Sequence, residues 1–92
     1  MNRQRAHAPD GWLITERGKT EDGVGFVRGA KQLPDGGYVT VYVEPFTGYY
    51  LFRQHDGKGD ATCGGHGSGC KRFGEAAWRA EEGLAQMGAI RG

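Results

Sequence analysis

The residues with the clearest chemical potential lie in segment 55–70, which holds both cysteines and two of the three histidines of the chain. Its central part reads "CGGHGSGC", with the spacing C-x2-H-x3-C and a further histidine upstream. Thiolate sulfur and imidazole nitrogen are ligands that zinc prefers, and a structural site usually takes four of them. The spacing therefore predicts a zinc site, and zinc is the one cofactor that the sequence suggests. Its ligands would be His55, Cys63, His66 and Cys70.

The same segment is open to four other interpretations. A disulfide between Cys63 and Cys70 would close a short loop, although such bonds persist mainly in oxidising compartments. The glycines that precede Lys71 would cradle an anion at the start of a following helix. Either cysteine beside His66 has the atoms of a nucleophile–base pair. The interpretation we favour is a solvent-exposed, glycine-rich connector in which the cysteines and histidines have no chemical role.

A second candidate site is formed by aromatic and cationic residues in segments 38–44 ("YVTVYVE") and 49–54 ("YYLFRQ"). The first segment alternates between valine and larger polar residues, which is the pattern of a strand with one buried face. If Glu44 pairs with Tyr49 across the turn, one face of the hairpin is apolar and the other is rich in tyrosine. Tyrosine and arginine on an open sheet face can stack bases and meet phosphates, and they are also enriched at protein interfaces.

We expect this tyrosine-rich face to bind a partner. Arg28, from the preceding predicted strand, would extend it, and Trp78, on the flank of the predicted helix, is a second candidate anchor. A second copy of the chain would also cover such a face, so a homodimer is an alternative to a different partner. The predicted partner-binding residues are Tyr38, Tyr42, Tyr49, Arg53, Arg28 and Trp78.

These residues must be positioned by a small number of strands and one helix. β-Branched and aromatic content, with turn sequences between, predicts strands over 12–17, 24–32, 38–44 and 49–54. The segment "RFGEAAWRAEEGLAQMGAI" is an amphipathic helix with an apolar stripe of Phe73, Ala77, Ala80, Leu84 and Met87. Its glycines lower helix propensity, so it needs a sheet to pack on. We predict an α+β fold, a three- or four-stranded antiparallel meander with one C-terminal helix packed on the valine face.

Length and composition favour one small domain of 92 residues. We expect residues 1–10 to form a flexible tail and residues 11–92 a single α+β domain with a glycine-rich loop at 55–71. The net charge of +1 and the pI of about 7.8 differ from the strongly basic profile of most DNA-binding domains. No apolar run is long enough for a signal peptide or a membrane span. We therefore expect a soluble cytoplasmic protein without a membrane partner.

Two segments, "GGYVTVYVEPFTGYYLF" and "RFGEAAWRAEEGL", resemble the three-strand-plus-helix DNA-binding domain at the N-terminus of phage integrases and in plant ethylene-response factors. The family's phenylalanine and Glu-Ala-rich helix match Phe73, Glu75, Ala76 and Ala77. The resemblance implies that the sheet enters the major groove. The residues that it would place near DNA are Arg28, Tyr38, Tyr42 and Arg53. In size and sheet-plus-helix organisation the chain also resembles small phage accessory proteins, anti-CRISPR inhibitors among them.

These observations lead to one functional expectation and two alternatives. We expect a non-enzymatic binding protein that occludes a protein or nucleoprotein partner, in the manner of a phage or mobile-element inhibitor of the anti-CRISPR kind. The first alternative is direct DNA binding through the sheet face, as in the integrase-type domain. The second is a zinc- or thiol-dependent enzyme that uses residues of segment 55–70.

Overall fold

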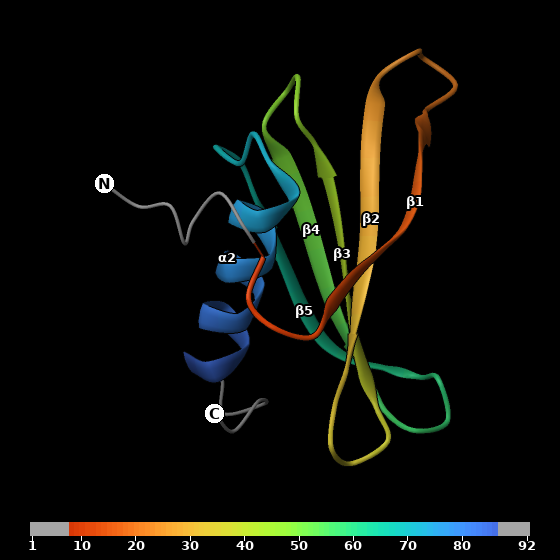
Figure 1. Cartoon of the computed structure of the whole chain (residues 1–92), viewed down its shortest axis with the longest axis vertical. Helices are drawn as coiled ribbons and strands as arrows, with labels where there is room; N and C mark the ends of the chain where they lie inside the picture. The colour runs from red at the N-terminus through yellow and green to blue at the C-terminus, as the bar shows by residue number, and fades with distance from the viewer. Residues whose placement is uncertain (1–7, 87–92) are drawn as a thin grey trace.

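The computed structural model of the chain describes residues 8–86 and consists of an antiparallel sheet with one helix packed against it (Figure 1). The five strands lie side by side in chain order, so the sheet is a meander. The elements are β1 (Trp12–Lys19), β2 (Gly25–Gln32), β3 (Tyr38–Glu44), β4 (Tyr49–His55), β5 (Ala61–Gly67) and α2 (Phe73–Gln86). The predicted α+β meander with one C-terminal helix is confirmed, but the sheet has five strands instead of three or four.

The additional strand is β5, which lies within the long connector that the sequence predicts. It pairs with β4 along its length. The sequence pattern does not predict this strand, because its glycines carry no side chain that could alternate between polar and apolar. A Cβ on Gly65 would lie 2.8 Å from Cζ of Phe52, and one on Gly67 would lie 2.9 Å from Cε1 of Tyr50. The rings of Phe52 and Tyr50 therefore fill the space that strand side chains usually occupy.

The pairing of β3 with β4 has the predicted register, with Glu44 opposite Tyr49, Tyr42 opposite Leu51 and Thr40 opposite Arg53. The turn between them closes through a hydrogen bond of 2.7 Å, which the N–H of Gly48 donates to the carbonyl of Glu44. Gly48 has a φ of 83°, a conformation that glycine adopts without steric cost. Because the side-chain period of a strand is two, this register decides which residues face the helix and which face away.

The hydrophobic core lies between α2 and the sheet face that carries the β3 valines. Along the predicted stripe of the helix, Ala77, Ala80 and Leu84 are fully buried and Phe73 packs at the edge of the core. Met87, the last member of that stripe, lies outside the described residues. The buried apolar residues of the sheet include Trp12, Val27, Val39, Val41, Val43, Tyr50 and Phe52. The predicted packing of the helix on the valine face is confirmed.

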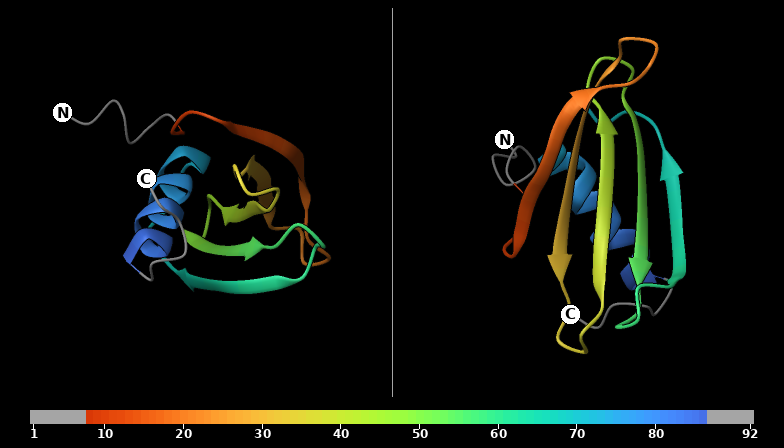
Figure 2. Two further views of the ribbon diagram at one scale, coloured as in Figure 1. Left: turned by 90° about the horizontal axis from the view of Figure 1, so that it is seen from below. Right: turned by 90° about the vertical axis from the view of Figure 1, so that its right-hand side faces the viewer.

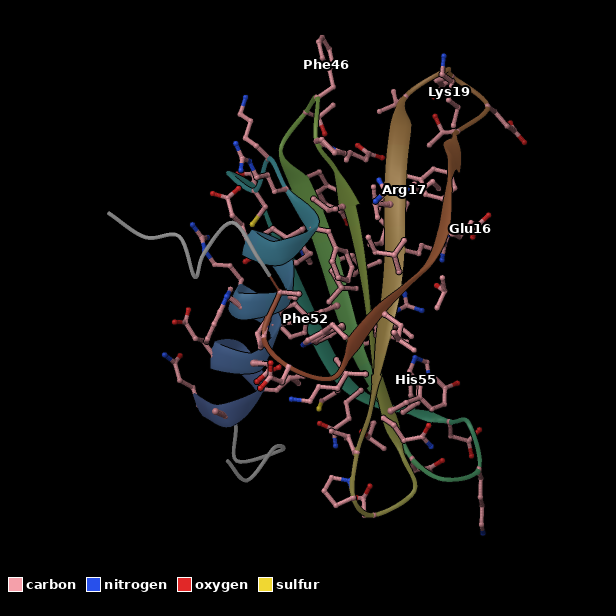
Figure 3. All side chains as sticks on the ribbon, in the orientation of Figure 1. Glu16, Arg17, Lys19, Phe46, Phe52 and His55 are labelled. Atoms are coloured by element: carbon pink, nitrogen blue, oxygen red, sulfur yellow. The ribbon has the colours of Figure 1, made fainter. Side chains whose placement is uncertain are left out.

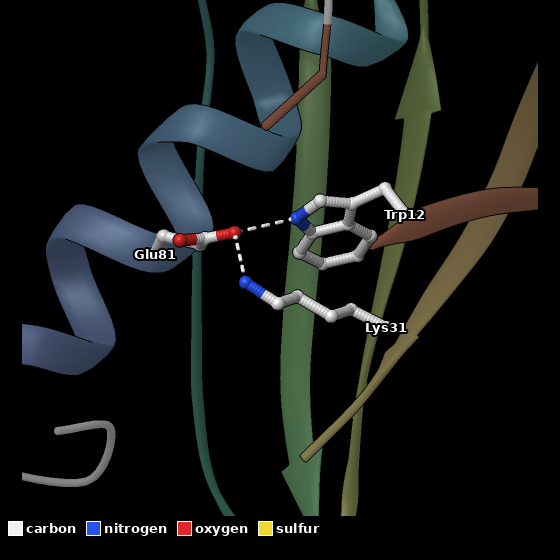
Figure 4. A network of polar contacts seen from close by, with 3 residues as sticks. All are labelled: Trp12, Lys31 and Glu81. Carbon is white, nitrogen blue, oxygen red and sulfur yellow. Dashed lines mark hydrogen bonds and ion pairs between the residues drawn. The ribbon is translucent and has the colours of Figure 1, made fainter. Parts of the chain in front are cut away.

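Polar contacts of Glu81 link β1 and β2 to α2. Oε2 of Glu81 accepts a hydrogen bond of 2.7 Å from the indole Nε1 of Trp12 (Figure 4). The same oxygen lies 2.9 Å from Nζ of Lys31. Ala8, at the described end of the predicted tail, packs against the core, and residues 1–7 lie outside the described part of the chain. The contact of Glu81 therefore joins elements that are far apart in the sequence.

The sheet is covered on one side only within residues 8–86. Figure 2 shows α2 behind the sheet in the right-hand view, with the opposite face of the strands turned toward the reader. No helix among these residues is long and apolar enough to cross a membrane. Within residues 8–86, the second face of the sheet is therefore left uncovered.

Candidate functional site

The uncovered sheet face consists of the side chains that alternate with the core residues along each strand. Cross-strand pairing arranges them in rows, and three neighbouring rows run across the middle of the sheet. One outer row contains Glu16, Arg28, Tyr42, Leu51 and His66. The other outer row contains Gln32, Tyr38, His55 and Ala61. The middle row contains Leu13, Ala30, Thr40, Arg53 and Gly64.

The middle row includes two short side chains. Ala30 and Thr40 are neighbours at its centre, and larger side chains stand in the rows on either side. A hollow of about 460 Å³ lies over this part of the sheet. The polar and aromatic side chains that line it are Thr15, Arg28, Tyr38, Thr40, Tyr42, Arg53 and His55. Among the described residues that line the hollow there are two arginines and no Asp or Glu.

The aromatic rings on this face are held by one another. Tyr38 stacks on His55, with ring centroids 4.6 Å apart and planes 9° from parallel. Tyr42 stacks on Phe26 at 5.4 Å and 28°. The guanidinium carbon of Arg28 lies 5.1 Å from the centroid of Tyr42 and 5.5 Å from that of Phe26, within range of a cation–π interaction. The rings of Tyr38 and Tyr42 are therefore held in place in the absence of a partner.

Two carboxylates lie beside the hollow and are engaged with residues of the face. Oε1 of Glu16 lies 3.3 Å from Nε of Arg28. Oε2 of Glu44 accepts a hydrogen bond of 2.5 Å from the hydroxyl of Tyr42. Desolvation and this hydrogen bond together raise the pKa of Tyr42 from 10.0 to about 12. Tyr42 therefore remains a neutral hydrogen-bonding ring throughout the physiological pH range.

Arg53 is the cation of the hollow that lacks a carboxylate neighbour. Its residue is exposed, and among residues 8–86 its side chain has neither a hydrogen bond nor an ion pair. A Cβ on the adjacent Gly64 would lie 3.1 Å from Cγ of Arg53, so the absence of a side chain there makes room for the arginine stem. The guanidinium is therefore available to an anionic group, which it could meet through two parallel hydrogen bonds.

The imidazole of His55 is held in one orientation. Nδ1 lies 3.3 Å from the carbonyl oxygen of Gly59, to which it can only donate. Nε2 lies 3.5 Å from the hydroxyl of Thr40, which donates to it in the neutral tautomer. Figure 3 shows His55 on the side of the sheet away from α2 and Phe52 on the side toward it. His55 thus belongs to the wall of the hollow and supports the ring of Tyr38.

Five of the six predicted partner-binding residues lie on this face, and the sixth does not. The five are Tyr38, Tyr42, Tyr49, Arg53 and Arg28. Trp78 is a half-buried residue of α2, in the layer that covers the other side of the sheet. Sequence reasoning missed Phe26, because glycines interrupt the alternation of β2. The pairing of β2 with β3 is the signal that would have identified it.

The structure does not bring the four predicted zinc ligands together. His55 and His66 lie on the uncovered face, where they neighbour Tyr38 and Tyr49. Cys63 packs against the core on the opposite side of the sheet, and Cys70 is fully buried within it. Within the described residues no group of three or more His, Cys, Asp or Glu is placed to hold a metal ion. Strand formation at 61–67 separates Cys63 from His66, because it sends alternate side chains to opposite faces.

The cysteines also lack the arrangement that the thiol interpretations require. Both are free, so the disulfide is not formed. Cys63 and His66 are an odd number of positions apart in β5, so their side chains point to opposite faces of the sheet. Burial raises the pKa of the Cys70 thiol, which disfavours the thiolate that would act as a nucleophile or metal ligand. In this structure Cys70 is a small apolar core residue.

Comparison with known proteins identifies no relative of this chain. No family model matches the chain, and no curated protein or solved structure matches it significantly. The assignment of a function therefore depends on the geometry of the uncovered face.

Proposed function

We propose that the chain is a non-enzymatic binding protein and that the uncovered sheet face binds nucleic acid. The observation that supports this proposal best is the lining of the hollow, which combines Arg28, Arg53 and two tyrosine rings without a carboxylate. Arginine meets phosphate and aromatic rings stack on bases, so the two kinds of group recognise the two parts of a nucleotide. Like the integrase-type domain that the sequence resembles, the chain would bind nucleic acid through its sheet face. The proposal depends on the residues that line the hollow and not on a shared topology.

An electrophoretic mobility shift with a random-sequence duplex and a single strand of equal length tests this function. We expect a complex with at least one of them at about 50 mM salt, and a weaker complex at about 200 mM, because phosphate contacts release counterions. Replacement of Arg53 with Gln should weaken the complex. The proposal is contradicted if neither nucleic acid shifts at the lower salt concentration.

A second candidate function is occlusion of a protein surface, as an inhibitor of a nucleoprotein complex. It is favoured by two exposed apolar side chains, Phe46 with 88% and Leu13 with 72% of its surface accessible. Phe46 stands at the tip of the β3–β4 hairpin, where Figure 3 shows it pointing away from the molecule. Aromatic residues are enriched at protein interfaces, so Phe46 is the candidate anchor of this function.

Addition of the chain to an RNA-guided nuclease cleavage reaction tests the inhibitor function. We expect cleavage to fall with the parent chain and to be restored by Phe46→Ser, which removes the anchor without disturbing a buried contact. A variant of an exposed polar loop residue, Lys58→Ser, is the control. Equal inhibition by the parent chain and Phe46→Ser would show that the hairpin tip is not the anchor.

A further inference from the structure

Resting on the proposed function, we infer that the nucleic acid bound by the sheet face is single-stranded. A base of the strand would enter the hollow between Tyr38 and Tyr42, and a backbone phosphate would lie on Arg53. This inference names the form of the ligand, which the proposed function leaves open. It follows from the shape of the hollow, the fixed orientation of its rings and the small charge of the chain.

The shape of the hollow suits a base that is not stacked in a duplex. Tyr38 and Tyr42 lie on one strand with Thr40 between them, so their Cα atoms are about 13 Å apart. The space between the two rings is part of the hollow of about 460 Å³, a volume in the range of sites that take small-molecule-sized groups. A paired base cannot enter such a space without leaving its stack, whereas a single strand presents its bases already unstacked.

The walls of the hollow are organised in advance. His55 supports the ring of Tyr38, and Phe26 with Arg28 supports the ring of Tyr42. A ring that is already fixed loses little conformational freedom when a base stacks on it, which favours binding. Stacking on such rings accepts any base, because every base has a π-face. We therefore expect binding with little sequence preference.

The charge of the chain also favours a single strand over a duplex. Duplex affinity comes largely from the neutralisation of many phosphates, and duplex-binding domains are usually strongly basic. This chain has a net charge of +1, and only Arg28 and Arg53 supply formal positive charge to the hollow. Glu16 neutralises part of the charge of Arg28. Base stacking needs no excess of positive charge, so it can provide affinity where phosphate contacts are few.

The test is fluorescence anisotropy of the full chain with fluorescein-labelled dT12, a duplex of the same length, and unlabelled dTMP as competitor. We expect dT12 to bind more tightly than the duplex. We also expect dTMP to compete only at much higher concentration, because it offers a single base and phosphate. The affinity for dT12 should fall only modestly between about 50 and 200 mM salt, since few phosphates are contacted.

Three variants locate the site. Tyr38→Leu keeps an apolar side chain but removes the ring, and Arg53→Gln removes the unpaired cation. Each should weaken dT12 binding about five-fold or more, the loss expected for one stacked base or one phosphate contact. Arg72→Gln is the matched control, since Arg72 is exposed beside the start of α2 and does not line the hollow. Circular dichroism melting shows whether Tyr38→Leu is folded, and Arg53→Gln tests the site independently of that result.

The outcomes separate this inference from the proposed function. Tight duplex binding with no dT12 binding overturns the single-strand inference and leaves nucleic-acid binding by the face intact. Binding of neither overturns both. Competition by dTMP at the concentration of dT12 overturns the inference in favour of a free-nucleotide site. Equal dT12 affinities for the parent chain and all three variants overturn it as well, because the strand would then lie elsewhere.

Discussion

Tyr42 is the residue at which the packing and the electrostatics of the uncovered face meet. Its ring stacks on Phe26 and carries the guanidinium of Arg28, while its hydroxyl donates to Glu44. Glu44 lies only two positions away in the chain, whereas Phe26 and Arg28 belong to the neighbouring strand β2. A single side chain thus joins β2 and β3 on the side of the sheet that lacks a core.

The raised pKa of Tyr42 leads to a prediction about its titration. Ultraviolet absorbance should detect a tyrosine that ionises near pH 12, because desolvation and the Glu44 hydrogen bond favour the neutral phenol. A folded-state pKa above the unfolded value contributes stability below pH 10, and this stability is lost as pH rises from 10 toward 12. Glu44→Gln should lower this pKa part of the way toward 10.0, and Tyr42→Phe should remove the transition. Unchanged titration in both variants would contradict the assignment.

At the scale of elements, the glycines of β5 allow this edge strand to lie close to the rings of Phe52 and Tyr50. The ring of Phe52 lies between Gly65 of β5 and Gly83 of α2, since a Cβ at these positions would lie 2.8 Å and 3.1 Å from its Cζ. The helix glycine that lowers helix propensity therefore allows the helix to approach the ring closely. Glycines that suggest a loose connector in the sequence are packing positions in the structure.

Replacement of Gly65 with Ala should destabilise the fold. The added methyl would overlap the ring of Phe52, and overpacking of this kind costs about 1–3 kcal/mol. Gly25→Ala is the matched control, because a Cβ there meets no atom within 4 Å and the residue also lies in a strand. Urea denaturation measures both free energies of unfolding. The packing role of Gly65 fails if the two variants are equally stable.

The contact of Glu81 with Trp12 and Lys31 is the second feature at this scale. Glu81→Gln removes the charge that Lys31 faces and weakens the acceptor for the Trp12 indole. Because the residues are partly buried, we expect a loss of about 1.5–3 kcal/mol, the usual range for hydrogen bonds to charged groups. Glu21→Gln, in an exposed turn, should leave stability unchanged. Hydrogen exchange should show faster opening of β1 in the first variant only.

For the molecule as a whole, the main feature is a sheet with two unlike faces. One face is covered by α2 and contains the core, whereas the other presents fixed aromatic rings and two arginines around a hollow. The difference between the two faces also explains why the four predicted zinc ligands do not lie together. His55 and His66 fall on one face while Cys63 and Cys70 fall on the other.

Metal removal is therefore a test of the whole arrangement. The melting temperature of the full chain should not change on addition of EDTA, because no group of three or more His, Cys, Asp or Glu among residues 8–86 is placed to hold a metal ion. The Cys63→Ser variant should also show no response to the chelator. A fall in the melting temperature of the parent chain that is absent in Cys63→Ser would instead support the zinc site predicted from the spacing.

Local periodicity in the sequence determined a large part of the fold. The valines of 38–44 alternate, and the apolar residues of the helix recur at helical spacing, so both patterns indicate which side chains are buried. The turn at Gly48 then determined the register of β3 with β4, and with it four of the five predicted residues that share the uncovered face. These features depend on interactions between residues that are close in the chain.

Only the tertiary structure decided the rest. β5 is a strand because Phe52 and Tyr50 fill the space beside its glycines, and a sequence without side chains at those positions carries no periodic signal. The hollow is lined by residues of β1, β2, β3 and β4 that only the assembled sheet brings together, and Phe26 joins the face through the pairing of β2 with β3. Trp78 is separated from the candidate site because it lies in α2, and Cys63 because its side chain packs on the core face of β5. Contacts of this kind are set by packing between distant segments, which spacing along the chain does not record.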